Sequence, residues 1–254
     1  MKNTQSEFEL LRDAFPEDPA MGPALSRVLL DQVSSGERAA TVRLSRPGRV
    51  VAFGRRDTNA NGYQKAVAAA RSSGFEAMER IAGGRAAAYT EGTLSMTMTF
   101  ADRTPARRTN ERFEYAAGLA RGALSDLGID ARVGEVPGEY CPGAFSVNSG
   151  GLTKIVGIGQ RMISGAAHVG FVIAVRNADL IRRVLEPVYA SLGLDWQPST
   201  VGAVEDELPE AGLATVEEAL LARISASSRL VENELDTATV DLARSRAGRF
   251  LSPG

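Results

Sequence analysis

The chain is poor in the residue types that most often carry chemistry. Its 254 residues include one cysteine, Cys141, and one histidine, His168. A single cysteine cannot form an internal disulfide or a cysteine-based zinc site, and a single histidine excludes most histidine-rich metal centres. The single histidine also means that a Ser-His-Asp triad would have only one candidate base. We therefore expect no bound metal, and we expect Cys141 to be a free thiol in a reducing compartment.

Lysine is nearly absent as well. The 29 basic residues include only three lysines, Lys2, Lys65 and Lys154, which leaves 26 arginines. Lys65 falls in a segment expected to form an exposed helix, whereas Lys154 falls in the apolar, glycine-rich run TKIVGIG. An ammonium group is compact and its pKa can move, unlike that of a guanidinium group. Lysine at position 154 therefore indicates a chemical role; the alternative is a surface lysine whose stem covers apolar neighbours.

The chain has no strong net charge and no long apolar run. Its formal net charge is −2, from 29 basic and 31 acidic residues, so no uniform field would attract nucleic acid or an anionic membrane. No run approaches the roughly 18 apolar residues of a membrane span, and the N-terminal stretch MKNTQSEFELLRDAF lacks the apolar centre of a signal peptide. We expect a cytoplasmic protein with no nucleic-acid and no membrane partner.

The patterns that are present indicate a mixed sheet flanked by helices. The stretch TLSMTMTF alternates apolar and polar residues with the period of two that is typical of a strand. The runs KIVGIGQRMI and HVGFVIAV follow each other across a short glycine turn, as in a hairpin. Because neighbouring strands lack helices between them, we expect an α/β (α+β) fold with a mixed, largely antiparallel sheet. We also expect a strand around 41–46 paired across a Pro-Gly turn with 50–53, strands at 75–81 and 129–135, and helices at 21–35, 62–73, 113–128 and 178–193.

The length leaves room for one main domain. We expect residues 1–210 to form the catalytic domain. From Thr215 to Arg246 the spacing of apolar residues is helical again. Residues 211–254 are therefore expected to form a C-terminal helical extension that packs on the main domain.

Cys141 lies in a segment that predicts a tight loop. Gly138, Pro142 and Gly143 surround it in the sequence GEYCPG, and such a loop leaves the thiol free to face a pocket. A nearby ammonium, such as that of Lys154, would lower the pKa of the thiol. The residues favour a reacting pair, and they also allow Cys141 to be a small buried hydrophobe.

The stretch RIAGGRAAAYTEG predicts a third part of the same site. Gly83 and Gly84 would let a ligand approach the backbone closely, and Arg80 and Arg85 on either side would bind a carboxylate or phosphate. The stretch is neither a phosphate-binding P-loop nor a dinucleotide fingerprint, so a simple turn is the alternative. His168 is expected to be structural, because no neighbouring carboxylate would orient it as a base.

Taken together, these segments carry a family resemblance. The stretches VVAFGRRD, RIAGGRAAAYTEGTLSMT, GEYCPGAFSV and KIVGIGQR occur in the order and at the spacing found in lipoate and octanoate transferases and ligases. Over about residues 20–200 the chain resembles the biotin/lipoate protein ligase superfamily, and within it the branch of cysteine-dependent octanoyltransferases and amidotransferases. The resemblance implies a class II biotin/lipoyl ligase-like fold.

The resemblance also implies roles for particular residues. Cys141 would carry an acyl thioester, and Lys154 would be the active-site lysine of the superfamily. Arg80, Gly83 and Gly84 would lie along the acyl chain. With them, Arg85 and Gly157 complete the expected substrate-binding set, and no metal ligand is expected. The apolar faces of TLSMTMTF and KIVGIG would line a tunnel for an eight-carbon chain.

The function implied is transfer of an octanoyl or lipoyl group to a lipoyl-domain lysine through an acyl-Cys141 thioester, without a cofactor. The implied partners are the glycine cleavage H protein or the E2 lipoyl domains of 2-oxoacid dehydrogenases, with acyl carrier protein as a further candidate. Two alternatives stay open, an ATP-dependent lipoate-protein ligase, which would need ATP and Mg, and a non-catalytic binder of acyl chains or lipoyl domains. Ligases commonly read Ser-Gly-Gly-Gly where this chain has Ala82-Gly83-Gly84-Arg85, which disfavours adenylate chemistry.

Overall fold

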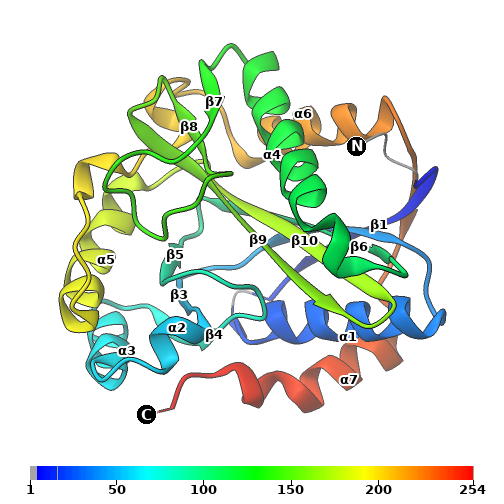
Figure 1. Cartoon of the computed structure of the whole chain (residues 1–254), viewed down its shortest axis with the longest axis horizontal. Helices are drawn as coiled ribbons and strands as arrows, with labels where there is room; N and C mark the ends of the chain where they lie inside the picture. The colour runs from blue at the N-terminus through cyan, green and yellow to red at the C-terminus, as the bar shows by residue number, and fades with distance from the viewer. Residues whose placement is uncertain (1–4, 16, 254) are drawn as a thin grey trace.

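An eight-stranded sheet forms the centre of the computed structural model, which describes residues 5–15 and 17–253 (Figure 1). The strand order is β11-β1-β2-β6-β10-β9-β8-β7. Strand β1 runs parallel to both β11 and β2, and every other pair in this sheet is antiparallel. The prediction of a mixed, largely antiparallel sheet is therefore confirmed. The strands are β1 Glu7–Ala14, β2 Thr41–Arg46, β6 Thr93–Ala101, β7 Ala131–Val133, β8 Val147–Ser149, β9 Thr153–Ile163, β10 Ala166–Ala174 and β11 Arg229–Asn233.

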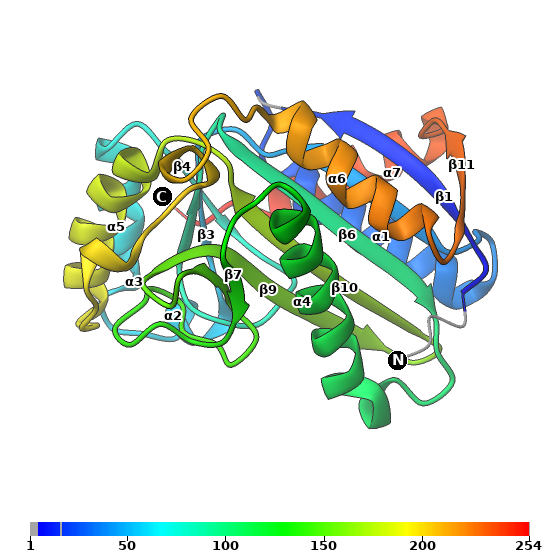
Figure 2. The ribbon, with the colours of Figure 1, turned by 90° about the horizontal axis from the view of Figure 1, so that it is seen from above.

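Helices cover both faces of this sheet (Figures 1 and 2). On one face, α4 packs on β9 and β10, and α6 packs on α4. On the other face, α1 packs on β6 and β10, and α7 packs on α1. The remaining helices α2, α3 and α5 lie at the end of the molecule that carries the smaller sheet. Their bounds are α1 Met21–Ser35, α2 Arg55–Thr58, α3 Tyr63–Ser72, α4 Thr109–Asp126, α5 Ala178–Leu192, α6 Leu213–Ser225 and α7 Thr237–Ala247.

The smaller sheet corrects one prediction. It has the order β4-β3-β5, from Glu76–Glu79, Val50–Phe53 and Ala87–Tyr89. The expected pairing of 41–46 with 50–53 is wrong, because β2 stays in the large sheet while β3 crosses to the small one. All four residues of β3 are buried, and a strand buried on both faces needs neighbours on both edges, which β4 and β5 provide.

The C-terminal segment contributes more than helices. Between α6 and α7 it contains β11, whose side chains are largely exposed and show no clear period of two, so the sequence pattern missed it. Its partner β1 was missed too. After α7 the chain crosses back to the small sheet, where Leu251 forms a bridge with Met78 and the Ser252 amide donates to the Ala77 carbonyl at 3.0 Å. A domain division at residue 210 stays a prediction. Among the helices of the described residues, none is long and apolar enough to cross a membrane.

Candidate active site

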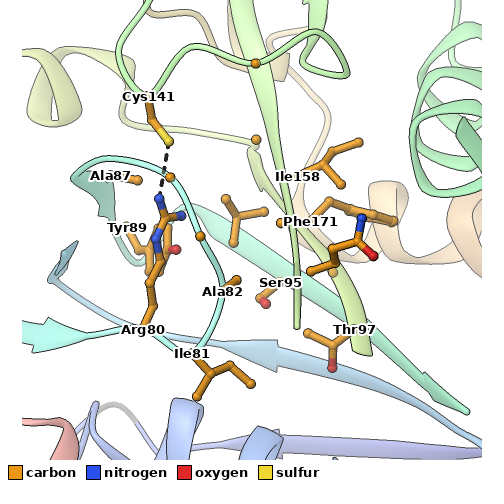
Figure 3. Close-up of a pocket in the computed structure, with 18 of the residues that line it drawn as sticks. Arg80, Ile81, Ala82, Ala87, Tyr89, Ser95, Thr97, Cys141, Ile158 and Phe171 are labelled. Carbon is orange, nitrogen blue, oxygen red and sulfur yellow. Dashed lines mark hydrogen bonds between the residues drawn. The ribbon is translucent and has the colours of Figure 1, made fainter. Parts of the chain in front are cut away.

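A cavity of about 500 Å³ lies between the large sheet, α1 and the loops around residues 80–86 and 140–146. This volume is typical of small-molecule sites. Six of the seven predicted site residues line it: Arg80, Gly83, Gly84, Cys141, Lys154 and Gly157. The close-up shows that Arg80 and Cys141 point toward each other on one side of the 81–84 loop (Figure 3).

Cys141 has an unusual backbone conformation. Its φ is +43°, and it is one of two non-glycine residues with positive φ in the described chain. Such a conformation costs free energy and persists only where the surroundings fix it. Here the Tyr189 hydroxyl accepts from the Cys141 amide at 2.7 Å, and Lys154 Nζ donates to the Cys141 carbonyl at 2.8 Å. The Tyr189 hydroxyl in turn donates to the Ala86 carbonyl at 2.9 Å, which ties the cysteine loop to the 80–86 loop.

The sulfur of Cys141 accepts two hydrogen bonds. Arg80 Nη2 and the Arg85 backbone amide each donate to Sγ at 3.2 Å. Burial raises the pKa of the thiol, but the charges of Arg80 and Lys154 and these two hydrogen bonds outweigh it, so the pKa of Cys141 lies below its usual value. A lowered pKa increases the fraction of the thiol that is present as thiolate, the nucleophilic form, at a given pH.

Lys154 serves mainly to hold the cysteine loop. Its side chain is 1% exposed, and Nζ donates to Glu139 Oε1 at 2.9 Å, to the Tyr140 carbonyl at 3.0 Å and to the Cys141 carbonyl. These three bonds use all three of its donors. The expectation that Lys154 lowers the pKa of the thiol is borne out through its charge, and Arg80, which contacts the sulfur, is a second and larger cause.

Glu139 is the site residue that sequence reasoning missed most clearly. It is buried and accepts from Lys154, from the Ser146 hydroxyl at 2.6 Å and from the amides of Val136 and Gly143. A buried lysine in an apolar run requires a buried counter-ion. The acid two residues before the only cysteine was the available signal.

The two glycines of the 80–86 loop differ in what surrounds them. Gly84 has φ +110°, and a Cβ there would lie 2.3 Å from Arg80 Nη2 and 2.8 Å from Cys141 Sγ. A Cβ on Gly83 would meet nothing within 4 Å. Gly84 therefore gives the arginine and the cysteine the space to meet, and Gly83 does not.

Arg85 lies differently from what the sequence indicated, whereas His168 is buried and hydrogen-bonded, as expected of a structural histidine. The side chain of Arg85 does not line the cavity; it pairs with the buried Asp57 at 3.2 Å, and only its backbone amide reaches the sulfur. His168 lines the cavity, and its Nδ1 bonds the Thr99 hydroxyl at 2.9 Å. Burial and the nearby Arg43 lower the pKa of His168 to about 4, so the ring is neutral at neutral pH.

The expected lining of the cavity by the methionine face of β6 is wrong. Leu94, Met96 and Met98 pack into the core on the α4 side of the sheet. Ser95 and Thr97, on the opposite face of the same strand, line the cavity. Apolar side chains reach it from elsewhere, and they include Ile81, Phe113, Phe145, Ile158, Phe171 and Val172.

Comparison with known proteins places this geometry in a family. Residues 18–225 match the model of the lipoyl protein ligase A/B catalytic domain. The chain belongs to the lipoyl protein ligase A/B family. A lipoate-protein ligase A solved bound with ATP has the same fold, with a TM-score of 0.78, 21% identity and coverage of 96% of this chain and 95% of that one. A bipartite lipoate protein ligase from Thermoplasma acidophilum, solved in a study of the ligase and its E2 lipoyl domain, has a TM-score of 0.75 at 20% identity. The match covers 96% of this chain and 93% of that one.

Curated relatives within the lipoyl protein ligase A/B family are named octanoyl-[GcvH]:protein N-octanoyltransferase. The one from Geobacillus kaustophilus is 27% identical over 89% of this chain and 77% of its own length. Those from Bacillus velezensis and Anoxybacillus flavithermus are 29% and 31% identical, over 74% and 61% of this chain. The chain spans 65% and 55% of the length of these last two.

Proposed function

We propose that the protein moves an octanoyl or lipoyl group to the lysine of a lipoyl-domain protein through a thioester on Cys141. The proposal rests on the position of the Cys141 sulfur, which accepts two hydrogen bonds and faces a cavity suited to a medium acyl chain. The names of the curated relatives support the reaction class. We propose the glycine cleavage H protein and E2 lipoyl domains as partners, with acyl carrier protein as a further donor. The cytoplasmic location stays a prediction.

In the first step the Cys141 thiolate attacks the carbonyl carbon of an acyl group held by a donor carrier as an amide or thioester. A C–S bond forms, and the carbonyl electrons move onto oxygen. As the oxyanion collapses, the bond to the donor nitrogen or sulfur breaks, and an amine leaving group takes up a proton from water. Arg80 and the Arg85 amide, which donate to Sγ, lie beside the atom that attacks and would be available as donors to the oxyanion.

In the second step the neutral amine of the acceptor lysine attacks the thioester carbonyl. An N–C bond forms, the C–S bond breaks, the amine nitrogen loses a proton to water and the Cys141 thiolate returns. No step consumes ATP, because the acyl group is already activated or is exchanged between equivalent amides. The hydrogen bonds from Lys154 and to Tyr189 keep Cys141 in its strained conformation through both steps.

ATP-dependent ligation is the second candidate, because a fold neighbour was solved bound with ATP. The described residues fit a triphosphate poorly. Three cations line the cavity there, and each already has partners: Arg43 pairs with Asp13, Lys154 pairs with Glu139, and Arg80 donates to Cys141 Sγ and to the Arg85 carbonyl. We therefore propose no cofactor. A non-catalytic binder of acyl chains is the third candidate, and an activated thiol at the cavity wall argues against it.

A transfer assay between two carriers separates the candidates. Octanoyl H protein and an unmodified E2 lipoyl domain are mixed with the enzyme, with and without ATP, and octanoylation of the E2 domain is followed by mass spectrometry. We expect transfer without ATP, its loss with Cys141→Ala and a nearly equal loss with Lys154→Arg, because the larger guanidinium cannot replace the three ammonium bonds in a buried site. If ligation of free octanoate requires ATP and Cys141→Ala stays active, the ligase replaces our proposal.

A further inference from the structure

Two exposed arginines lie beside the opening of the cavity. Arg55 and Arg56 begin α2, directly after Gly54. Gly54 packs so closely on Gly84 that a Cβ at Gly54 would lie 2.0 Å from the carbonyl oxygen of Gly84. Gly84 is exposed and also lines the cavity, so it lies where the cavity reaches the surface near Cys141. The two arginines therefore border the surface that a carrier protein must approach.

The side chains of Arg55 and Arg56 have no partner within the described part of the chain. Neither guanidinium group forms an ion pair or a hydrogen bond there, and the hydrogen bonds that other side chains make with Arg55 use its backbone carbonyl. Arg85, on the neighbouring loop, is in contrast held by Asp57. An exposed guanidinium without a partner keeps all of its donors for another molecule.

The surroundings of these arginines lack negative charge. The loops 80–86 and 140–146 border the cavity and contain no acidic residue. Over residues 54–75 the only acidic residue is Asp57, which is buried and accepts from Arg85. This edge of the cavity is therefore basic, although the net charge of the whole chain is −2.

A basic edge on a weakly acidic protein favours one kind of partner. The net charge does not attract an acidic protein from a distance, so recognition of one depends on a local patch. Opposite charges on two facing surfaces speed their encounter and fix its orientation more than they raise affinity. Arginine is enriched in protein interfaces and pairs well with carboxylates. Two free arginines at the opening would thus orient an acidic surface toward the cavity.

We propose that Arg55 and Arg56 form a docking site for an acidic face of the carrier protein. The inference rests on the proposed acyl transfer through Cys141 and names the surface on which that site receives its carriers. Carboxylates of the carrier would pair with the two guanidinium groups while the acyl-lysine enters the cavity past Gly84. These arginines touch the carrier and not the reacting atoms. Their loss should therefore slow reactions with carriers and leave the reactivity of the thiol unchanged.

The test follows the same sulfur with and without a carrier. The rate of acyl-Cys141 formation from octanoyl H protein, used below saturation, is measured by intact mass, and iodoacetamide alkylation reports on the thiol itself. The double variant Arg55→Gln, Arg56→Gln should react about fivefold to tenfold more slowly with H protein at low salt. Its alkylation should stay within about twofold of wild type. High salt screens exposed charges and should remove the difference with H protein.

Two further pairs of substitutions separate docking from other effects. Arg55→Lys with Arg56→Lys keeps both charges and should retain most of the rate with H protein. Arg103→Gln with Arg121→Gln is the matched control, because it removes the same charge from two exposed arginines elsewhere. Arg103 lies near the β9–β10 turn, and Arg121 lies on α4. This control should leave the rate with H protein within about twofold of wild type.

Three results would overturn the inference. They are an unchanged rate with H protein in the double glutamine variant, an equal loss in the control pair, and a matching loss of alkylation, which would mean that the arginines act on the thiol. A wild-type enzyme that is alkylated normally and yet forms no adduct with octanoyl H protein would instead remove the proposed function, and this inference with it.

Discussion

At the scale of single residues, the site depends on how one sulfur atom is held and charged. The sequence singled out Cys141 and Lys154 because cysteine and lysine are so scarce, and both line the cavity. It named Lys154 as the cation that lowers the pKa of the thiol, but it did not identify Arg80, which lowers this pKa further and contacts the sulfur. Chain spacing suggests which residues are neighbours, but it does not say where their donors point. Lys154 donates to Glu139 and two carbonyls, which leaves the sulfur to Arg80.

Arg80→Gln tests this assignment. Removing the guanidinium charge next to the sulfur should raise the pKa of Cys141. The thiolate would then form only at higher pH, so the pH profile of alkylation by iodoacetamide should shift upward. Arg85→Gln is the matched control, because its side chain contacts Asp57 and its backbone amide remains at the sulfur. Equal profiles for wild type and Arg80→Gln would show that the contact does not control the thiol.

His168 gives a prediction on stability and pH. Its pKa is about 4 in the folded protein and near 6.5 when exposed. The unfolded chain therefore binds more protons between these values, and folding stability from this group is lost as pH falls from 7 to 5, by about 2 kcal/mol. In His168→Asn, the free energy of unfolding should fall by about 2 kcal/mol less between pH 7 and pH 5 than in the wild type. Urea titrations at the two pH values measure this difference. Acyl-enzyme formation at pH 7 should stay within about tenfold of wild type, because the neutral ring touches no reacting group.

Two different results would contradict the two predictions for His168. An unchanged pH dependence of unfolding would mean that the ring is not buried as described. A loss of acylation near a thousandfold would make His168 the base of the reaction.

At the scale of elements, the 80–86 loop determines whether Arg80 and Cys141 can meet. Gly84→Ala should lower acyl-enzyme formation about a hundredfold, because the new methyl group would force apart two groups whose contact positions the nucleophile. Gly83→Ala, one residue away in open space, should stay within about threefold of wild type. Rates are measured by intact mass after circular dichroism confirms the fold of both variants. Similar rates for the two variants would contradict the role given to Gly84.

The strands show what the sequence could and could not predict. The alternation in TLSMTMTF identified β6 correctly. Periodicity shows that the two faces of a strand differ, but it does not say which face borders a cavity. The apolar face of β6 packs in the core against α4, and its hydroxyl-bearing face borders the cavity. The hairpin β9–β10 was predicted because both strands are long and adjacent, whereas exposed β11 has no pattern to recognise.

At the scale of the whole molecule, segments near both ends of the described chain make contacts with residues far away in the sequence. Strands β1 and β11 pair at one edge of the large sheet, and the tail after α7 binds the small sheet through Leu251 and Ser252. The Ser252 hydroxyl accepts from Tyr63 at 2.8 Å, and Arg71 donates to its carbonyl at 2.8 Å. Such long-range contacts follow from the complete fold and leave no local signal in the sequence.

Truncation after Gly248 tests the tail. It removes the bridge to Met78, which lines the cavity, and the hydrogen bonds of Ser252. The free energy of unfolding should fall by about 1–3 kcal/mol, and amide exchange in β4 should become faster. Ser252→Ala removes only the hydroxyl contact and should cost less. Unchanged exchange in β4 would show that the tail does not stabilise the small sheet.

The central claim is that Cys141 itself carries the acyl group. The most direct measurement is the intact mass of the enzyme after incubation with octanoyl H protein in the absence of ATP and of any acceptor. The account predicts an added mass of one octanoyl group, located on Cys141 by peptide mapping, removed by hydroxylamine and absent from Cys141→Ala, whose fold should persist because the loop residue leaves little cavity. An unmodified wild-type enzyme that still transfers octanoyl groups, or an adduct that survives in Cys141→Ala, would contradict it.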